Sequence, residues 1–340
     1  MNRTASIKDV ANHASVAVGT VSNVLNYPDR VSQRTKERVL RAIDELGFVR
    51  NDAARQLRAG HSRTIGLIVL DVGNPFFTSV VRAAEDAAAL QGSAVLLGDS
   101  GHDAGREAKY IDLFQEQRVQ GLLISPVGDV TERLDLLRER GVPTVLVDRL
   151  ADEEKFSSVA VDDDAGGYLA ARHLLDTGRR RLAFVGGSTS IRQVADRLEG
   201  ARRAVKEEPD AALEVLESDD MTVLAGRSVG NRLVERDSKD LPDGIFCAND
   251  LLALGVMQSL TMTHTLRIPE DIALIGYDDI DFAVSAVVPL SSIRQPTEAL
   301  GRTAIELLAE EVEAQHSRHR AVIFTPELVV RQSTGAPSAG

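Results

Sequence analysis

The chain has 340 residues, of which 43% are hydrophobic and 26% are charged, and its formal net charge at pH 7 is −12. This length predicts two or three domains rather than one small core. The sequence has no long apolar run and its first residues are polar, so we expect neither a membrane-spanning helix nor a secretory leader, and we expect a cytoplasmic protein.

The charge is unevenly distributed along the chain. Residues 1–63 contain eleven lysines and arginines against six acidic residues, a net charge of +5, which leaves −17 for the remainder. A basic segment on an acidic body is typical of a protein in which only that segment meets a polyanion such as nucleic acid. From charge alone, the alternative is that this segment is basic by chance and binds no polyanion.

Two short helices are predicted at the start of the chain. Ser6 and Asp9 form an S-x-x-D capping box at the beginning of the first helix, which covers residues 7–14. After a break at residues 15–16, a second helix covers residues 17–25, because its apolar side chains recur at helical spacing. The small polar residues of this second helix are left on its outer face.

A third helix follows a turn at residues 27–30, with the sequence Y-P-D-R. Ser32 is expected to cap this helix, which covers residues 33–46, and Gly47 to end it. Two short helices joined by a tight turn and supported by a third define a helix-turn-helix module, here over residues 1–49. Such a module places its second helix in the major groove of DNA.

The second helix carries side chains suited to that role. Thr20 and Ser22 can donate hydrogen bonds to phosphates. Asn23 can pair with a base edge, and Val18 can contact a thymine methyl group. The alternative is that Asn23 is a solvent-exposed residue of the helix surface and contacts no base.

Several motifs in this segment resemble the signature of the LacI/GalR family of bacterial repressors. They are K8-D-V-A11, T20-V-S22, V24-L-N26 and V31-S-x-x-T35, followed by V39-L-R-A-I-D-E-L-G47. The resemblance extends over nearly the whole chain. It implies that Val18, Gly19 and Asn23 read base edges. It also implies that Thr20, Ser22 and Asn26 contact the DNA backbone.

Two positions depart from the family pattern. The family usually has Gly-Val-Ser in the turn, whereas this chain has Ser15-Val16-Ala17, and alanine cannot cap a helix as serine does, at a cost of about 1 kcal/mol. Asn23 stands where the family often has arginine. An arginine–guanine contact is therefore not expected, and the operator sequence does not follow from the helix.

Residues 50–62 connect the basic segment to the body. With Asn51 as its N-cap, a helix here has about eight residues, too few to be stable alone in water. A solvated linker is the alternative. The family resemblance implies a hinge helix, of which two copies in a dimer enter the minor groove. Leu57 then acts as an apolar wedge between base pairs, with Arg55 and Arg58 beside it.

From residue 64 onward, apolar strand-like runs alternate with helix-length segments, the pattern of an α/β protein with parallel sheets. The runs are 64–70, 94–98, 121–125, 144–148, 158–161, 181–186, 244–248 and 272–276. The runs ending at 148 and 161 have no helix between them, so we expect two doubly wound lobes, similar to periplasmic sugar-binding proteins. This effector-binding and dimerisation domain takes residues 63–332. By the resemblance, the first lobe covers residues 63–161 and 294–324, the second covers 162–293 and 325–332, and a disordered tail covers 333–340.

The body carries no cofactor motif. It has no G-x-G-x-x-G loop after a strand, no P-loop and no H-E-x-x-H pair, and its histidines are not grouped with a nucleophile. The acidic run D162-D-D164 opens a helix, where acids are favoured without a metal. The one cysteine, Cys247, lies in an apolar run and excludes an internal disulfide. We therefore expect no cofactor, no metal and no enzymatic activity.

Polar side chains gather where the strands end, which is where open α/β sheets bind ligands. Carboxylates, an amide and a guanidinium can pair with the hydroxyls of a sugar, and an aromatic ring (Phe76, Phe77 or Tyr277) can cover its apolar face. Each side chain has a turn or a helix cap as its alternative role. The resemblance implies effector contacts for Arg197, Asn249 and Asp278 and, less directly, Asp148. The candidate effector site consists of Asp71, Asn74, Phe76, Asp148, Arg197, Asn249 and Asp278.

Together these features predict a homodimeric repressor that reads a near-palindromic operator. A small sugar-like effector bound between the lobes would control its affinity for that operator. A periplasmic-type sugar receptor is the first alternative, but a receptor of that type does not explain the basic helical segment. A doubly wound enzyme is the second alternative, but this sequence lacks the cofactor loop that such an enzyme would need. The sequence does not choose between an inducer and a corepressor, or between a dimer and a tetramer.

Overall fold

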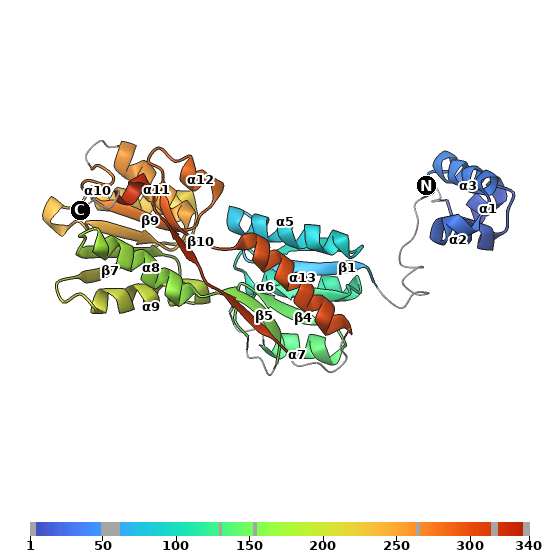
Figure 1. The fold of residues 1–340 in the computed structure, drawn as a ribbon, viewed down its shortest axis with the longest axis horizontal. Coiled ribbons are helices and arrows are strands. Elements are labelled where there is room, and N and C mark those ends of the chain that lie inside the picture. Colours follow the sequence, from blue (N-terminus) through green and yellow to red (C-terminus); the bar gives the residue numbers. More distant parts are fainter. Residues whose placement is uncertain are drawn as a thin grey trace. The chain divides into compact units, whose positions relative to one another are not determined.

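The computed structural model of the chain describes residues 5–48, 62–128, 131–151, 155–262, 266–313 and 319–335 (Figure 1). The chain forms two compact units, residues 1–62 and 63–340. The expected hinge helix, with Arg55, Leu57 and Arg58, lies outside the described residues.

The described part of the N-terminal unit, residues 5–48 and 62, contains three helices and one short 3-10 turn. They are α1 (Ile7–His13), α2 (Val18–Asn26), η1 (Pro28–Arg30) and α3 (Gln33–Glu45). Their apolar faces meet in a small core that contains Val10, Val21 and Val39. The predicted capping box is present, because the Asp9 N–H donates to the Ser6 hydroxyl at 3.3 Å and the Ser6 N–H donates to the Asp9 carboxylate at 2.8 Å. The predicted helix-turn-helix module is confirmed.

The ends of α2 and α3 differ in part from the prediction. No side-chain hydrogen bond caps α2, whose N-cap residue is Ala17, as expected. Ser32 stands at the N-cap of α3, but its hydroxyl pairs with the Thr35 hydroxyl at 2.9 Å rather than with a backbone N–H. The prediction that the Ser32 side chain caps α3 is therefore wrong. Gly47 has a φ of +57°, the left-handed conformation in which glycine ends a helix.

The first lobe of the body is built on a parallel sheet of six strands. In spatial order these are β11 (Ala321–Phe324), β5 (Ser157–Val161), β4 (Thr144–Val147), β3 (Gly121–Ile124), β1 (Thr64–Val69) and β2 (Ala94–Asp99). Its helices are α5 (Pro75–Leu90), α6 (Ala104–Glu116), α7 (Thr131–Glu139) and α13 (Thr297–Glu313). Helices α5 and α13 lie side by side on one face of this sheet and bury strand residues such as Leu67 and Val145 (Figure 1).

The second lobe has a sheet of the same size. In spatial order its strands are β12 (Glu327–Val329), β10 (Ser291–Arg294), β9 (Ala273–Asp278), β8 (Gly244–Cys247), β6 (Arg181–Gly186) and β7 (Ala212–Glu217). All pair in parallel except β12, which is antiparallel to β10. The helices are α8 (Asp163–Asp176), α9 (Arg192–Lys206), α10 (Val223–Val234), α11 (Asp250–Met262) and α12 (Asp281–Val284), with 3-10 turns η2 (Ser238–Asp240) and η3 (Gln332–Thr334).

The chain passes between the lobes three times, after β5, after β10 and after β11. The first and third passages touch, because the Asp162 N–H donates to the Phe324 carbonyl at 3.0 Å. The second and third also touch, because Arg294 pairs with Glu327 in the antiparallel ladder. The predicted pair of doubly wound lobes is confirmed. Within the described residues, no helix combines the length and the apolar character needed to cross a membrane.

The end of the described chain corrects one prediction. Ser333 and Thr334, expected to begin a disordered tail, are buried in the second lobe. The Ser333 hydroxyl donates to the Leu274 carbonyl at 2.6 Å, and the Thr334 hydroxyl lies 2.8 Å from a ring nitrogen of His173. The polar composition was misleading because these hydroxyls have partners inside the lobe. Residues 336–340 lie outside the described residues.

Candidate functional site

Helix α2 presents the six residues predicted to contact DNA. Val18, Gly19, Asn23 and Asn26 are exposed, and Thr20 and Ser22 are half-buried. The Asn26 amide donates to the Ser22 carbonyl at 2.8 Å and to the Ser22 hydroxyl at 3.1 Å. The helix, with the sequence VGTVSNVLN, carries no acidic side chain, so a phosphate meets no like charge on it.

Close packing of two helices fixes the deepest part of the site in the body. A Cβ atom at Gly167 on α8 would collide with the Arg197 carbonyl on α9, and one at Gly200 would collide with the Asp164 carbonyl. Only glycine lets the two backbones approach so closely. This approach brings the Arg197 side chain onto Asp163, the first residue of α8.

Arg197 is the centre of a buried charge cluster. Its exposed fraction is 4%, its Nε donates to the Asp163 carboxylate at 2.7 Å, and its Nη1 donates to the Ala248 carbonyl at 2.7 Å. Its guanidinium lies over the Tyr277 ring, 3.6 Å from the centroid, and 3.9 Å from the Asp278 carboxylate. Burial alone lowers the pKa of Arg197, but Asp163 and its neighbours raise that pKa above its ordinary value. Arg197 therefore stays charged.

Hydrogen bonds join the lobes across the cleft between them. Asn74, the N-cap of α5 in the first lobe, donates to Asp278 of the second lobe at 2.9 Å. Gln193, on α9 of the second lobe, donates to the Asp148 carboxylate of the first lobe at 2.9 Å. Asp148 and Asp278 have positive φ values, +56° and +103°. Positive φ is uncommon outside glycine, although aspartate adopts it more readily than most residues. Strained positions cluster at ligand sites, so both carboxyls are candidates for ligand contact.

Burial changes the ionisation of these two carboxyls. It raises the pKa of Asp148 to about 8, together with the charge of Asp163 and against the opposing charge of Arg197. It raises the pKa of Asp278 to about 6, although Arg197 and the bond from Asn74 lower it. Burial therefore favours the protonated form of Asp148, which can both donate and accept a hydrogen bond. Its Oδ1 atom is buried and has no partner among the described residues.

All seven predicted effector residues line one cavity of about 40 Å³, which we call the inner cavity. This volume is little more than the roughly 30 Å³ that one water molecule occupies in the liquid. A sugar therefore enters only when the lobes separate or the side chains rearrange. The predicted residues on its wall are Asp71, Asn74, Phe76, Asp148, Arg197, Asn249 and Asp278.

Three of these residues also have the turn and cap roles that the sequence left open. The Asn74 side chain accepts from the Phe76 N–H at 3.0 Å at the start of α5. The Asn249 side chain accepts from the Leu252 N–H at 2.9 Å at the start of α11. Asp71 accepts from the Gly73 N–H at 2.7 Å. These bonds fix the orientation of the three side chains, which still line the inner cavity.

The aromatic rings are less available than predicted. Tyr277 is fully buried, and Arg197 covers its ring, so this ring cannot stack on a sugar. Phe76 and Phe77 border the inner cavity but pack edge to face in the core of the first lobe, with their centroids 5.0 Å apart. The apolar wall includes Leu70 and Met221 as well.

The sequence prediction missed part of the wall. His102, Ile191, Gln193, Val194 and Met221 also border the inner cavity. Gln193 lies one helical turn before Arg197 on α9, so helix periodicity carried a signal for it. His102 and Met221 lie in loops after strands β2 and β7, where no periodicity applies.

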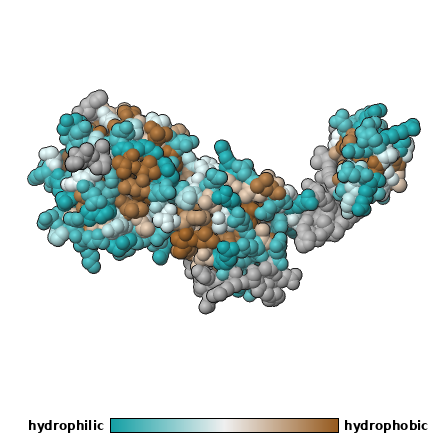
Figure 2. Space-filling view, viewed as in Figure 1, coloured by the Kyte–Doolittle hydropathy of each residue, from teal (hydrophilic) through white to brown (hydrophobic). Residues whose placement is uncertain are grey.

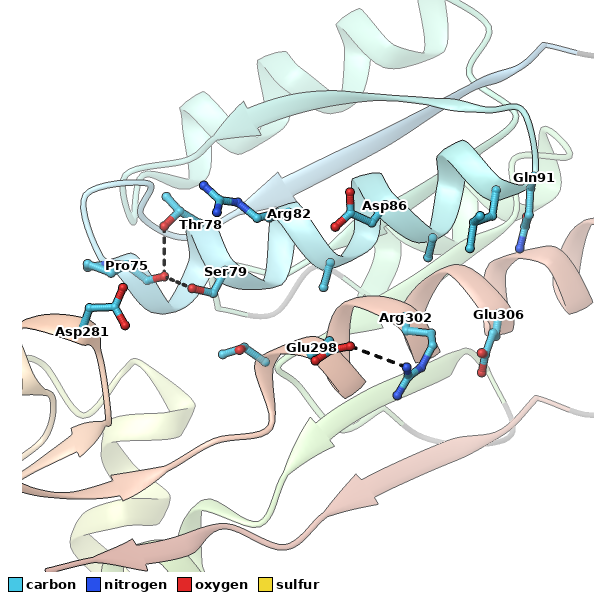
Figure 3. Close-up of a pocket in the computed structure, with 14 residues that line it drawn as sticks. Pro75, Thr78, Ser79, Arg82, Asp86, Gln91, Asp281, Glu298, Arg302 and Glu306 are labelled. Atoms are coloured by element: carbon cyan, nitrogen blue, oxygen red, sulfur yellow. Dashed lines mark hydrogen bonds and ion pairs between the residues drawn. The ribbon is translucent and has the colours of Figure 1, made fainter.

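A separate hollow of about 650 Å³ lies between α5 and α13 of the first lobe (Figure 3). Charged side chains of both signs lie along the two helices, and Arg302 is 3.9 Å from Glu298. They are Arg82, Asp86, Glu298, Arg302 and Glu306. These charges are spread along two helices rather than converging on one point, unlike the polar groups of the inner cavity.

A helix-turn-helix unit with an open polar helix, together with a two-lobed body and a polar interlobe cavity, defines a ligand-responsive DNA-binding regulator. Residues 6–51 match the family of bacterial regulatory proteins called the lacI family, and residues 171–334 match the periplasmic binding protein-like domain. The HTH-type transcriptional repressor PurR of Aliivibrio salmonicida is 34% identical over 336 residues, which cover 97% of this chain and 98% of the relative. The chain belongs to the lacI family of bacterial regulatory proteins.

Solved structures give the same result. The transcriptional regulator CelR in complex with cellobiose is 31% identical, with a TM-score of 0.70 over 97% of this chain and 99% of the other. The lac repressor dimer bound to operator and the anti-inducer ONPF is 26% identical, with a TM-score of 0.82 over 98% of this chain and 100% of the other. These relatives are transcriptional regulators rather than enzymes, which confirms the functional class predicted from the sequence.

Proposed function

We propose that this regulator binds a near-palindromic operator as a homodimer, reads it through α2, and changes its operator affinity when a neutral sugar-like effector binds between the lobes. The observation that carries this proposal is the convergence of side chains from both lobes on the inner cavity. A ligand that contacts both lobes has a different affinity for each arrangement of the lobes, which is the requirement for control by a ligand.

The charges in the inner cavity favour a neutral effector. Arg197 is the only lysine or arginine among the described residues that line it, and Asp163 already pairs with that guanidinium. The carboxyl groups of Asp71, Asp148 and Asp278 lie on the same wall. A phosphate or carboxylate would therefore meet the Asp278 carboxylate and no unpaired lysine or arginine among the described residues of this wall, whereas hydroxyl groups would find donors and acceptors. The cellobiose complex of the relative CelR agrees with this choice.

A thermal-shift screen of neutral sugars, nucleobases and sugar phosphates tests the effector class. A ligand that binds the folded chain raises its melting temperature by mass action. Neutral sugars are expected to produce the shift. A shift with sugar phosphates alone contradicts this part of the proposal.

Asn23→Ala is expected to weaken binding to the preferred operator about 5- to 150-fold, because one contact to a base edge contributes about 1–3 kcal/mol. Binding to unrelated DNA should change little, since phosphate contacts dominate it. Titrated mobility shifts on an operator selected from random palindromes measure both affinities. Asn12→Ala, at an exposed asparagine of α1, is the matched control. Equal losses on both DNAs show that Asn23 does not read a base.

Leu57→Ala tests the hinge-helix proposal. If Leu57 is a wedge at the operator centre, its loss weakens specific binding more than non-specific binding and reduces the DNA bend. Circular-permutation gel shifts measure the bend, and filter binding measures the two affinities. Leu40→Ala, at a half-exposed leucine of α3, is the control. An unchanged bend contradicts the wedge.

Exposed apolar side chains on the body support a homodimer. Leu90 at the end of α5 has an exposed fraction of 91%, and Leu96 and Leu97 on the edge strand β2 have 39% and 43%. Figure 2 shows apolar areas, in brown, among the hydrophilic surface of the body. A contact of two copies would cover such side chains and bring two α2 helices to the two halves of a palindrome. Sedimentation equilibrium tests this; a strict monomer contradicts it.

The effector acts by shifting a balance between lobe arrangements. Moving occupancy from nearly all of one arrangement to nearly all of the other takes a differential affinity of about 5.5 kcal/mol. An inducer favours the arrangement that releases DNA, and a corepressor favours the arrangement that holds it. Mobility shifts with and without the sugar found in the screen decide between them.

A further inference from the structure

A second hollow adjoins the inner cavity at the mouth of the cleft. This outer hollow has a volume of about 430 Å³. It shares five wall residues with the inner cavity, so the two spaces adjoin each other. The shared residues are Leu70, His102, Ile191, Gln193 and Met221. Even without the inner cavity, the outer hollow has a volume within the roughly 300–1,000 Å³ typical of small-molecule sites.

Both lobes build the wall of the outer hollow from the segments that follow their strands. The first lobe contributes residues 101–102 after β2, 126–128 after β3 and Arg149 after β4. The second lobe contributes residues 187–188 and 190–193 after β6 and 219–221 after β7. A ligand here would therefore contact both lobes at the carboxyl ends of their sheets, as in the inner cavity.

The chemistry of this wall matches a polyhydroxylated ligand without net charge. The wall contains two arginines, Arg149 and Arg192, and two aspartates, Asp219 and Asp220. Arg192 also bonds to Asp196 at 2.8 Å. The hydroxyls of Ser188 and Ser190 add further donors and acceptors. With the two signs balanced, the wall offers hydrogen bonds to hydroxyl groups and no net attraction for an anion.

His102 lies where the two spaces join. Its φ of +58° is the left-handed conformation, uncommon for a residue other than glycine, and its N–H donates to the Leu70 carbonyl at 3.2 Å. Its Nδ1 atom is buried and has no hydrogen-bond partner among the described residues. Asp148 Oδ1, on the inner wall, is likewise buried and without a partner there. Buried polar atoms are usually paired, so these two atoms on the cavity walls are available for hydrogen bonds to a ligand.

We propose that the effector has at least two sugar units and is a neutral disaccharide, longer oligosaccharide or glycoside. One unit replaces the Asn74–Asp278 and Gln193–Asp148 bonds in the inner cavity, and the next unit occupies the outer hollow, with His102 Nδ1 bonded to the ligand at the junction. This inference rests on the proposed function and specifies its ligand. A single monosaccharide would leave the outer hollow without a role.

Calorimetric titration of the full-length chain tests the size of the ligand. The probes are cellobiose, gentiobiose, maltose, lactose, xylobiose and cellotriose, with glucose, galactose and xylose as their units. At least one oligosaccharide is expected to bind about tenfold or more tightly than each of its units, because a second unit adds contacts in the outer hollow. A unit that binds as tightly as the oligosaccharides containing it overturns the inference, and so does a panel in which nothing binds. Neither result affects operator binding, which tests the proposed function separately.

Ser190→Trp places an indole in the outer hollow, at an exposed position that should tolerate it. The bound oligosaccharide should lose at least about tenfold in affinity, while the weaker binding of its unit stays unchanged. Ser238→Trp, at an exposed serine of η2, is the matched control. Unchanged oligosaccharide binding by Ser190→Trp, or an equal loss for the unit, contradicts a second unit in this hollow.

His102→Gly and His102→Asn separate the hydrogen bond from the backbone conformation, since both residues tolerate positive φ. The glycine variant is expected to bind the oligosaccharide about tenfold more weakly, and the asparagine variant, which keeps a polar group, within about threefold of the original chain. Equal affinities for the original chain and the glycine variant overturn the assignment of His102. Unchanged melting temperatures of both free variants confirm that the fold is intact.

Discussion

Arg197→Ala is expected to lower the free energy of unfolding of the body by about 3–5 kcal/mol, the usual effect of removing one partner of a buried ion pair. The substitution leaves the Asp163 and Asp278 carboxyls buried without a positive neighbour, and it leaves the Ala248 carbonyl without its donor. It also uncovers the Tyr277 ring. Urea denaturation followed by circular dichroism measures the change.

Arg202→Ala is the matched control for this experiment. Arg202 lies on the same helix, but its side chain is 56% exposed and only 3.7 Å from an exposed Glu199. Exposed ion pairs contribute about 1 kcal/mol or less, so the control should unfold almost as the original chain does. If Arg197→Ala unfolds like Arg202→Ala, the cluster is not required for the stability of the lobe.

A structural role for Arg197 limits what an Arg197 variant can show about the effector site. Because Arg197 supports the fold of the second lobe, loss of a ligand response in Arg197→Ala does not by itself show that the ligand touched the guanidinium. Variants at His102 and Ser190, which lie on the wall rather than in the core, separate ligand contact from folding.

Asp148→Asn is expected to stabilise the body by on the order of 2 kcal/mol or more at about pH 8, because one pKa unit corresponds to about 1.4 kcal/mol. The pKa of Asp148 is raised to about 8 in the folded chain. Between about pH 4 and that value the folded chain holds a proton that the unfolded chain has lost, so stability falls as pH rises through this window. Asparagine has the same shape, keeps an oxygen for the bond from Gln193, and needs no proton.

Thermal unfolding from about pH 5 to 8.5 measures this effect. The melting temperature of the original chain should fall more steeply with rising pH than that of Asp148→Asn, with a difference of about 5 °C at the upper end. Asp112→Asn, at an exposed position of α6, should follow the original chain. Parallel curves for the original chain and Asp148→Asn would mean that Asp148 is ionised throughout.

The sequence predicted the two-lobed body well because most strands are continuous apolar runs, as the strands of a buried parallel sheet must be. Strand β7, with the sequence ALEVLE, was missed because it is an edge strand with half-exposed and charged positions. Strand β10, with the sequence SSIR, was missed because its buried serines look like a turn. Ser291 and Ser292 are satisfied inside by Thr334 and Asp250, at 2.7 Å each, a pairing that only the folded chain makes.

The candidate site, too, was predicted only in part from the sequence. The ends of parallel strands predicted five polar wall residues, because topology brings those ends to one edge of each sheet. They are Asp71, Asn74, Asp148, Asn249 and Asp278, whereas Arg197 was implied by the family resemblance and Phe76 was named as a candidate ring. The sequence could not show that Asp163 neutralises Arg197, since that pairing depends on the contact of α8 and α9 through glycines. Nor could it show that Asn74 and Gln193 bond to carboxylates of the opposite lobe, because those residues are more than forty positions from their partners.

The triple connection between the lobes has a mechanical consequence. Two lobes joined by one linker can change their relative orientation in any direction. Here three neighbouring segments that touch one another join the lobes, so the main motion left is hinge bending about the line on which these segments lie. Arg63 leads directly into β1, so the first lobe is the body to which the DNA-reading module is tethered. The second lobe can therefore rotate about this line relative to the first lobe, and a ligand that contacts both lobes would favour one angle between them.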